Sequence, residues 1–155
     1  MKARMDFRAA SPPAAKAIAD LHAFVHRCGL EHGLLELVKL RASQINGCAH
    51  CIDMHTKELR AAGESEQRLY LLDAWRESPF YSERERAALA WAEAVTLVTP
   101  GHVPDEVYAS ARGEFSEEEL ANLTVALVAI NAANRLNIAF RTVPGSHRAK
   151  VRAAE

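Results

Sequence analysis

Two cysteines three residues apart, Cys48 and Cys51, are the strongest chemical signal in this 155-residue sequence. If a helix begins at Asn46 or Gly47, both cysteines lie in its first turn, where free backbone N–H groups and the helix dipole stabilise a thiolate. Residues three apart in a helix have Cα atoms roughly 5 to 5.5 Å apart, a separation that a disulfide tolerates. The pair can therefore close and open reversibly.

Two residues near this pair in the sequence, Glu36 and His55, could exchange protons with the cysteines. His55 follows Cys51 by four residues, so its imidazole shares a helical face with the thiol and can accept the thiol proton. Glu36 lies on a preceding segment that the Asn46-Gly47 turn folds back. Its carboxylate could then approach the cysteines and orient a histidine or pass protons.

Helical periodicity runs through the rest of the chain, and no alternating apolar run is long enough for a strand. Two capping boxes, Ser82 to Glu85 and Ser116 to Glu119, mark helix starts. Gly63 suits a left-handed helix end, and the polar tail from Pro144 is expected to fray. We expect helices over about 12–29, 32–46, 48–62, 66–76, 83–98, 105–112 and 116–140.

Composition indicates one globular domain spanning residues 1–155, with its core at about 11–140. Apolar residues make up 49% of the chain and charged residues 25%, which excludes a disordered or fibrous protein. The net charge of −1 argues against a nucleic-acid partner. The first residues carry no apolar run, so we expect a cytoplasmic protein. The apolar stretch Leu120–Phe140 is interrupted by asparagines and Arg135, which predicts a core helix and no membrane partner.

The chemical motif and its flanks resemble a known family. A glutamate twelve residues before Cys-Ala-His-Cys, and a histidine four after it, is similar to the alkylhydroperoxidase D-like (AhpD-like) branch of the carboxymuconolactone decarboxylase superfamily. The resemblance continues through the flanking sequences at 35–48, 55–63, 85–93 and 131–140. It implies an all-α, single-domain helical bundle that assembles into homotrimers or homohexamers.

The resemblance also implies an activity, which is thiol-dependent reduction of organic hydroperoxides or hydrogen peroxide without a cofactor or bound metal. In that family the second motif cysteine attacks the peroxide and the first resolves the sulfenic acid, which assigns these roles to Cys51 and Cys48. Glu36, His50 and His55 match the proton-relay positions. The expected partner is an external dithiol reductant, either lipoylated or thioredoxin-like.

Other interpretations remain open for these residues. One alternative is a redox-sensing or metal-binding interaction protein, because zinc binds the side-chain types of Cys48, Cys51 and His55. One helical face offers three such ligands at most, which argues against a zinc site. A decarboxylase of the same superfamily is another alternative, but it needs no cysteine pair. Cys28 is expected to be a small buried residue, and Asn131, Asn134 and Asn137 to form structural hydrogen bonds. The histidines expected to be structural or at the surface are His22, His26, His32, His102 and His147.

Overall fold

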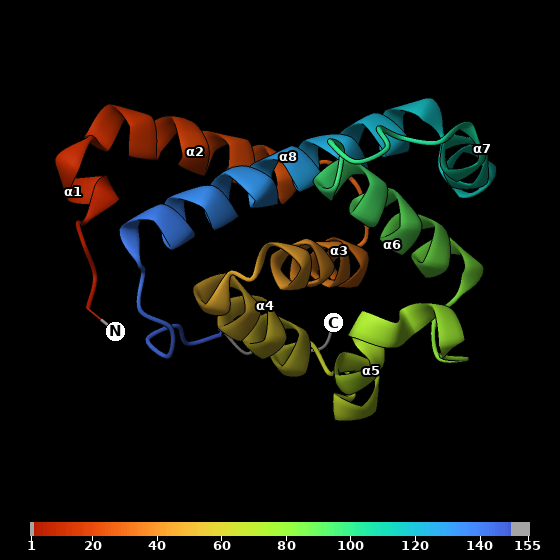
Figure 1. The fold of residues 1–155 in the computed structure, drawn as a ribbon, viewed down its shortest axis with the longest axis horizontal. Helices are drawn as coiled ribbons and strands as arrows, with labels where there is room; N and C mark the ends of the chain where they lie inside the picture. Colours follow the sequence, from red (N-terminus) through yellow and green to blue (C-terminus); the bar gives the residue numbers. More distant parts are fainter. Residues whose placement is uncertain (1, 150–155) are drawn as a thin grey trace.

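Helix α3 (His32–Asn46) lies at the centre of the molecule and has neighbours on all sides. In this computed structural model, which describes residues 2–149, it packs against α4 (Ala49–Ala61), α6 (Glu83–Thr96) and α8 (Glu117–Phe140) (Figure 1). Every residue from Leu34 to Leu40 is buried, including two charged ones. A helix buried all round has no solvent face, so its polar side chains must find partners inside the protein.

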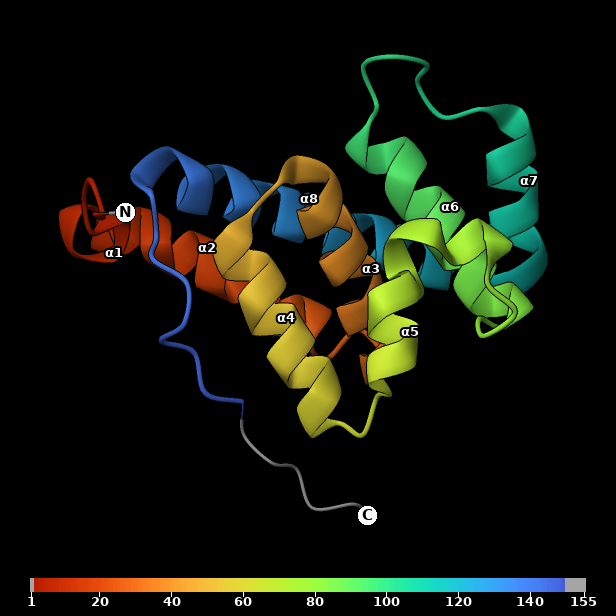
Figure 2. The same cartoon turned by 60° about the horizontal axis from the view of Figure 1, so that its bottom comes forward.

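The remaining helices surround this centre. Helix α2 lies along α8, and α7 packs on α6 at the far end of the molecule (Figure 2). No strand occurs within residues 2–149, so the prediction of an all-α fold is confirmed. These outer elements are α1 (Phe7–Ala10), α2 (Pro12–Val25), α5 (Glu66–Leu71), the 3₁₀ segment η1 (Leu72–Glu77) and α7 (Asp105–Glu114).

Two apolar clusters meet at α3. Leu35 and Val38 belong to the larger one, which α2, α6 and α8 complete. Leu37 and Leu40 belong to the smaller one, which includes Leu59 of α4 and residues of η1. With both of these faces occupied by apolar side chains, the buried polar residues of α3 share a third face of the helix. They are Glu36, Lys39 and Ser43.

A left-handed glycine makes the turn between α3 and α4. Gly47 has φ 68° and ψ 32°, and its N–H bonds back to the carbonyls of Ser43 and Gln44. Cys48 follows as the N-cap of α4. Helix α4 therefore begins at Ala49, one residue later than the predicted start at 48, because the left-handed glycine terminates α3 first.

Most predicted elements are present, with three further differences. Both capping boxes form, and Gly63 is left-handed at φ 92°. Helix α2 ends at Val25, and the predicted helix over 66–76 breaks into α5 and a 3₁₀ segment, with Ala74 non-helical. The short α1 was not predicted, and Asp6 caps it by accepting from the N–H groups of Arg8 and Ala9.

The expectation of a frayed tail is wrong for residues 144–149. Gly145 N–H donates to the carboxylate of Asp53 at 3.0 Å, and His147 Nε2 lies 2.5 Å from Glu58 Oε1. Lys57 Nζ adds a bond to the carbonyl of His147. Charged residues on the outer face of α4 therefore hold the tail against that helix, where Figure 2 shows it passing. Residues 150–155 lie outside the described part of the chain.

Helix α8 has the length and apolar content of a membrane span, and it is the one such helix in residues 2–149. Its inner face includes Leu123, Leu127 and Ile130, which are buried against the other helices. Its asparagines bond to residues of α3 and α6. The inner face of α8 is therefore part of the core, as the sequence predicts.

The α3–α4 turn can be tested with a pair of glycine substitutions. Gly47→Ala should lower the free energy of unfolding by about 1 kcal/mol, because alanine resists the left-handed conformation. Gly113→Ala, within α7 and with open space around its Cα, should raise it by about 0.5 kcal/mol. Urea unfolding measures both, and equal effects would contradict the assigned role of Gly47.

Candidate functional site

The two motif cysteines lie at the N-terminus of α4 and are joined by a disulfide. Cys48 is the N-cap and Cys51 the third helical residue, with Cα atoms 5.3 Å apart. Both are buried in the larger apolar cluster, with exposed fractions of 1% and 0%. The sequence prediction that this pair lies in the first turn and can close is confirmed.

Glu36 and His55 form a buried pair beside the cysteines. His55 Nδ1 lies 2.6 Å from Glu36 Oε2, and the two side chains are 6% and 3% exposed. The other carboxylate oxygen, Oε1, accepts from Lys39 Nζ at 2.9 Å. One carboxylate therefore bridges an imidazole on α4 and an ammonium on its own helix.

These partners keep Glu36 ionised. Burial is the strongest influence and raises its pKa, but the hydrogen bond from His55 and the charges of His55 and Lys39 together lower the pKa to about 2. A carboxylate only accepts hydrogen bonds, so a neutral His55 must carry its proton on Nδ1.

The second nitrogen of His55 is left as a base. Its Nε2 is buried and has no hydrogen-bond partner among residues 2–149. When His55 is neutral with its proton on Nδ1 toward Glu36, Nε2 holds a lone pair in a buried position one helical turn after Cys51. This atom can take a proton from a nearby thiol.

Lys39 and His22 belong to this cluster and were missed by sequence reasoning. Lys39 is only 2% exposed, and His22 on α2 has its pKa lowered first by burial and then by the Lys39 charge. The signal for Lys39 was available, since it stands three residues after Glu36 within the apolar run at 34–40. His22 carried no comparable signal, because only the packing of α2 places it here.

An amide network continues the polar face of α3 toward α8. Asn134 Nδ2 donates to Ser43 Oγ at 3.1 Å, and Asn46 Nδ2 donates to the side-chain oxygens of Asn131 and Asn134. The expectation of hydrogen bonding within the subunit is confirmed for these residues. Asn137 differs, because its Nδ2 lies 3.4 Å from Cys51 Sγ.

His50 lies apart from the Glu36–His55 pair. Its Nδ1 is 3.3 Å from the carbonyl oxygen of Val143, in the C-terminal tail. The structure thus brings together four of the predicted site residues and turns the fifth toward the tail. The four are Glu36, Cys48, Cys51 and His55.

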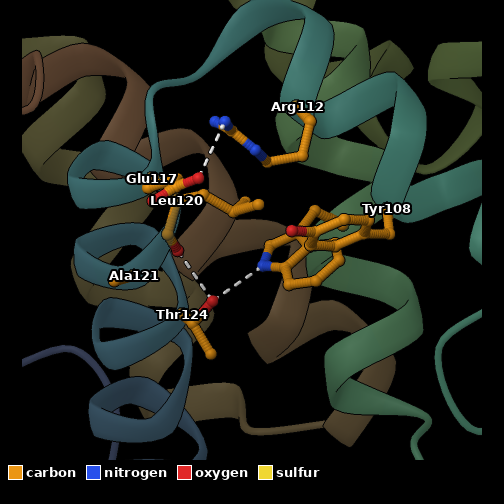
Figure 3. A pocket seen from close by; sticks show the side chains of 7 residues that line it. Tyr108, Arg112, Glu117, Leu120, Ala121 and Thr124 are labelled. Atoms are coloured by element: carbon orange, nitrogen blue, oxygen red, sulfur yellow. Dashed lines mark hydrogen bonds and ion pairs between the residues drawn. The ribbon is translucent and has the colours of Figure 1, made fainter.

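No group of three His, Cys, Asp or Glu side chains arranged to hold a metal occurs within residues 2–149. A separate pocket of about 240 Å³ lies between α7 and α8 (Figure 3). Its polar groups pair with one another, Trp91 Nε1 with Thr124 Oγ1 and Arg112 with Glu117. No cysteine or histidine is among the residues that line it.

Comparison with known proteins agrees with this geometry. Residues 12–94 match the model of the carboxymuconolactone decarboxylase family. The chain belongs to this family. The uncharacterised protein YdfG of Bacillus subtilis is 41% identical over 140 residues, which cover 90% of this chain and 95% of YdfG.

Solved structures place the chain within the AhpD-like branch. A protein of unknown function from Agrobacterium tumefaciens, for which a role in antioxidant defence as AhpD is suggested, is 47% identical with a TM-score of 0.91, covering 94% of this chain and 100% of that one. A cysteine-to-alanine variant of the debrominase Bmp8, solved in complex with 2,3,4-tribromopyrrole, shares the fold at 22% identity and a TM-score of 0.80, covering 89% and 74%. The predicted AhpD-like resemblance is confirmed.

The buried ion pair should show strong energetic coupling. Lys39→Met and Glu36→Gln should each destabilise the fold by about 3 kcal/mol, because each leaves a charged group without its partner, whereas the double variant should lose far less than the sum. The exposed pair Lys16–Asp20 is the control and should couple by about 0.3 kcal/mol. Additive losses at Glu36 and Lys39, measured by urea unfolding, would contradict the pairing.

The low pKa of Glu36 predicts acid sensitivity. A carboxylate whose folded pKa of about 2 lies below its unfolded value contributes stability above pH 4.5, and this is lost as the pH falls toward 2. The loss from this group should be on the order of 3 kcal/mol. The Glu36→Gln/Lys39→Met variant should show a shallower slope of unfolding free energy between pH 4.5 and 2, and an unchanged slope would contradict the assignment.

Proposed function

We propose that this protein is a thiol-dependent peroxidase that reduces organic hydroperoxides or hydrogen peroxide through a Cys48–Cys51 dithiol/disulfide cycle. The observation that carries the proposal is the unpartnered Nε2 of His55, held as a base by Glu36 one turn after a redox-active cysteine. Membership of the family and likeness to the Agrobacterium protein support it.

In the first step, His55 Nε2 accepts the thiol proton of reduced Cys51. The thiolate attacks the terminal oxygen of the hydroperoxide, the O–O bond breaks, and its electron pair leaves on the alkoxide. His55 returns the proton to that alkoxide, so the products are an alcohol and the Cys51 sulfenic acid. Cys51 takes this role because His55 follows it, and not Cys48, by four residues.

In the second step, Cys48 resolves the sulfenic acid. Its sulfur attacks Cys51 Sγ, the S–S bond forms, and hydroxide leaves as water with the proton of Cys48. An external dithiol then reduces the disulfide and is itself oxidised to a disulfide. We propose a lipoylated or thioredoxin-like protein for this reductant, and His50, whose Nδ1 lies near the carbonyl of Val143, as a proton-relay group.

We also propose a cytoplasmic homotrimer or homohexamer. A dithiol that must be reduced again after each turnover suits a reducing compartment. Large apolar side chains remain exposed on a single subunit, and their burial between copies would stabilise an oligomer. They include Phe24, Leu97, Val98, Tyr108 and Val128.

The proposed activity can be tested on fully reduced protein with one equivalent of cumene hydroperoxide. Two thiols per chain should be lost, and mass spectrometry should map a Cys48–Cys51 disulfide. Cys51→Ser should abolish the reaction, while Cys48→Ser should stop at a sulfenic acid that dimedone traps. His55→Gln should slow thiol loss by about a hundredfold, because the general base is removed.

Cys28→Ser provides the matched control, since this third cysteine lies outside the motif and should not change the rate. A reaction no faster than that of an ordinary free thiol would contradict the peroxidase proposal. Disulfide formation without repeated turnover in the presence of dithiols would instead favour a redox-sensing protein. Activity that persists in Cys51→Ser would favour decarboxylase-type chemistry.

A further inference from the structure

Asn137, near the C-terminal end of α8, reaches the sulfur of Cys51. Its Nδ2 lies 3.4 Å from Cys51 Sγ, which is an N–H···S hydrogen bond between residues 86 positions apart in the chain. The sequence predicts that Asn137 shares a structural stripe with Asn131 and Asn134. Those two pair with groups on α3 and α6, but Asn137 contacts a reacting atom.

We propose that Asn137 is a catalytic residue whose side-chain amide stabilises the thiolate of Cys51 and so selects this cysteine as the nucleophile. The inference rests on the proposed function for its role in turnover. A hydrogen bond to an ionised acceptor is stronger than one to a neutral acceptor, so a donor at this sulfur favours the thiolate over the thiol.

The selection matters because the helix N-terminus alone favours the other cysteine. Cys48 is the N-cap, and its sulfur already accepts from the backbone N–H of Cys51 at 3.4 Å. Any N-cap cysteine would receive such a donor. Cys51 obtains an equivalent donor from the side chain of Asn137 on α8. This second donor offsets the advantage that the N-cap position gives to the thiolate of Cys48, and so favours the thiolate of Cys51, which has His55 four residues later.

The asparagine stripe explains why this amide points at the sulfur. Asn134 donates to Ser43, and Asn46 donates to both Asn131 and Asn134. These bonds fix the rotation of α8 about its axis relative to α3. Residue 137, three positions further on, then lies on the same face and meets the start of α4.

The same bond assists reduction of the disulfide. When a thiolate of the external dithiol attacks Cys48 Sγ, a mixed disulfide forms there, the Cys48–Cys51 bond breaks, and its electron pair remains on Cys51. A thiolate with a lower pKa leaves faster. Asn137 thus directs attack to Cys48 and releases Cys51 in the form that reacts with peroxide.

Titratable groups of the site lie on several elements, and His147 of the C-terminal tail is paired with Glu58 on α4. His55 and Cys48 lie on α4, Glu36 and Lys39 on α3, and His22 on α2. On α8, Arg135 is exposed and bonds to Asn131. Substitution of Asn137 leaves all of these in place, so a change in the pKa of Cys51 reports the amide.

The test is the pH dependence of Cys51 alkylation by iodoacetamide, followed by mass spectrometry in Cys48→Ser protein. Asn137→Ala should raise the pKa of Cys51 by about one unit. At low pH the thiolate is then about tenfold scarcer but about threefold more nucleophilic, so alkylation should slow by about threefold. Above both pKa values it should accelerate by about threefold.

The alkylation rates of the parent and of Asn137→Ala, plotted against pH, should therefore cross. A structural change that only altered access to Cys51 would shift the alkylation rate in one direction at every pH. Asn137→Asp keeps the shape of the side chain and should raise the pKa of Cys51 further, since it replaces a donor with a negative charge. Asn122→Ala is the matched control, because this asparagine on the same helix donates to the carbonyl of Cys28.

Profiles of both Asn137 variants that superimpose on the parent would overturn the proposal. Alkylation uses neither peroxide nor reductant. A shifted pKa in a protein without peroxidase turnover would therefore support the Asn137–Cys51 bond and count against the proposed function alone.

Discussion

The carboxylate of Glu36 is the group on which both the fold and the site depend. It is buried, ionised and shared between Lys39 on its own helix and His55 on the next. A buried charge is tolerated only where partners surround it, so these contacts restrict how α3 and α4 can pack. They also set the tautomer of a neutral His55, with its proton on Nδ1, and Nε2 has no hydrogen bond from the described residues.

The polar face of α3 connects this carboxylate to the rest of the molecule. Its residues occur at helical spacing from Glu36 through Lys39 and Ser43 to Asn46. Glu36 contacts His55 of α4. Ser43 and Asn46 form hydrogen bonds with asparagines of α8. The contacts that orient the helices therefore also position the imidazole of His55 and the side-chain amide of Asn137 relative to Cys51.

Much of this arrangement could be predicted from local sequence. Capping boxes, the Gly47 turn and the i, i+3 and i, i+4 spacings of Cys48, Cys51 and His55 are short-range signals that the structure keeps. The contacts of Lys39, His22 and Asn137 depend on how helices distant in the chain pack, which no single helical pattern contains. The contacts of the C-terminal tail with α4 were missed for the same reason, because its partners Asp53, Lys57 and Glu58 lie about 90 residues earlier in the chain.

When His55 is neutral, its contact with Glu36 places the proton on Nδ1 and the lone pair on Nε2, and the proposed chemistry of the site requires this tautomer. Long-range ¹H–¹⁵N correlation spectra of uniformly labelled protein, recorded at a pH where the imidazole carries one proton, distinguish the two nitrogens directly. We expect a protonated Nδ1 and an unprotonated Nε2 for His55 in the parent protein, and loss of that tautomer preference in Glu36→Gln. A proton on Nε2 in the parent protein, with an unprotonated Nδ1, would contradict the role assigned to Glu36.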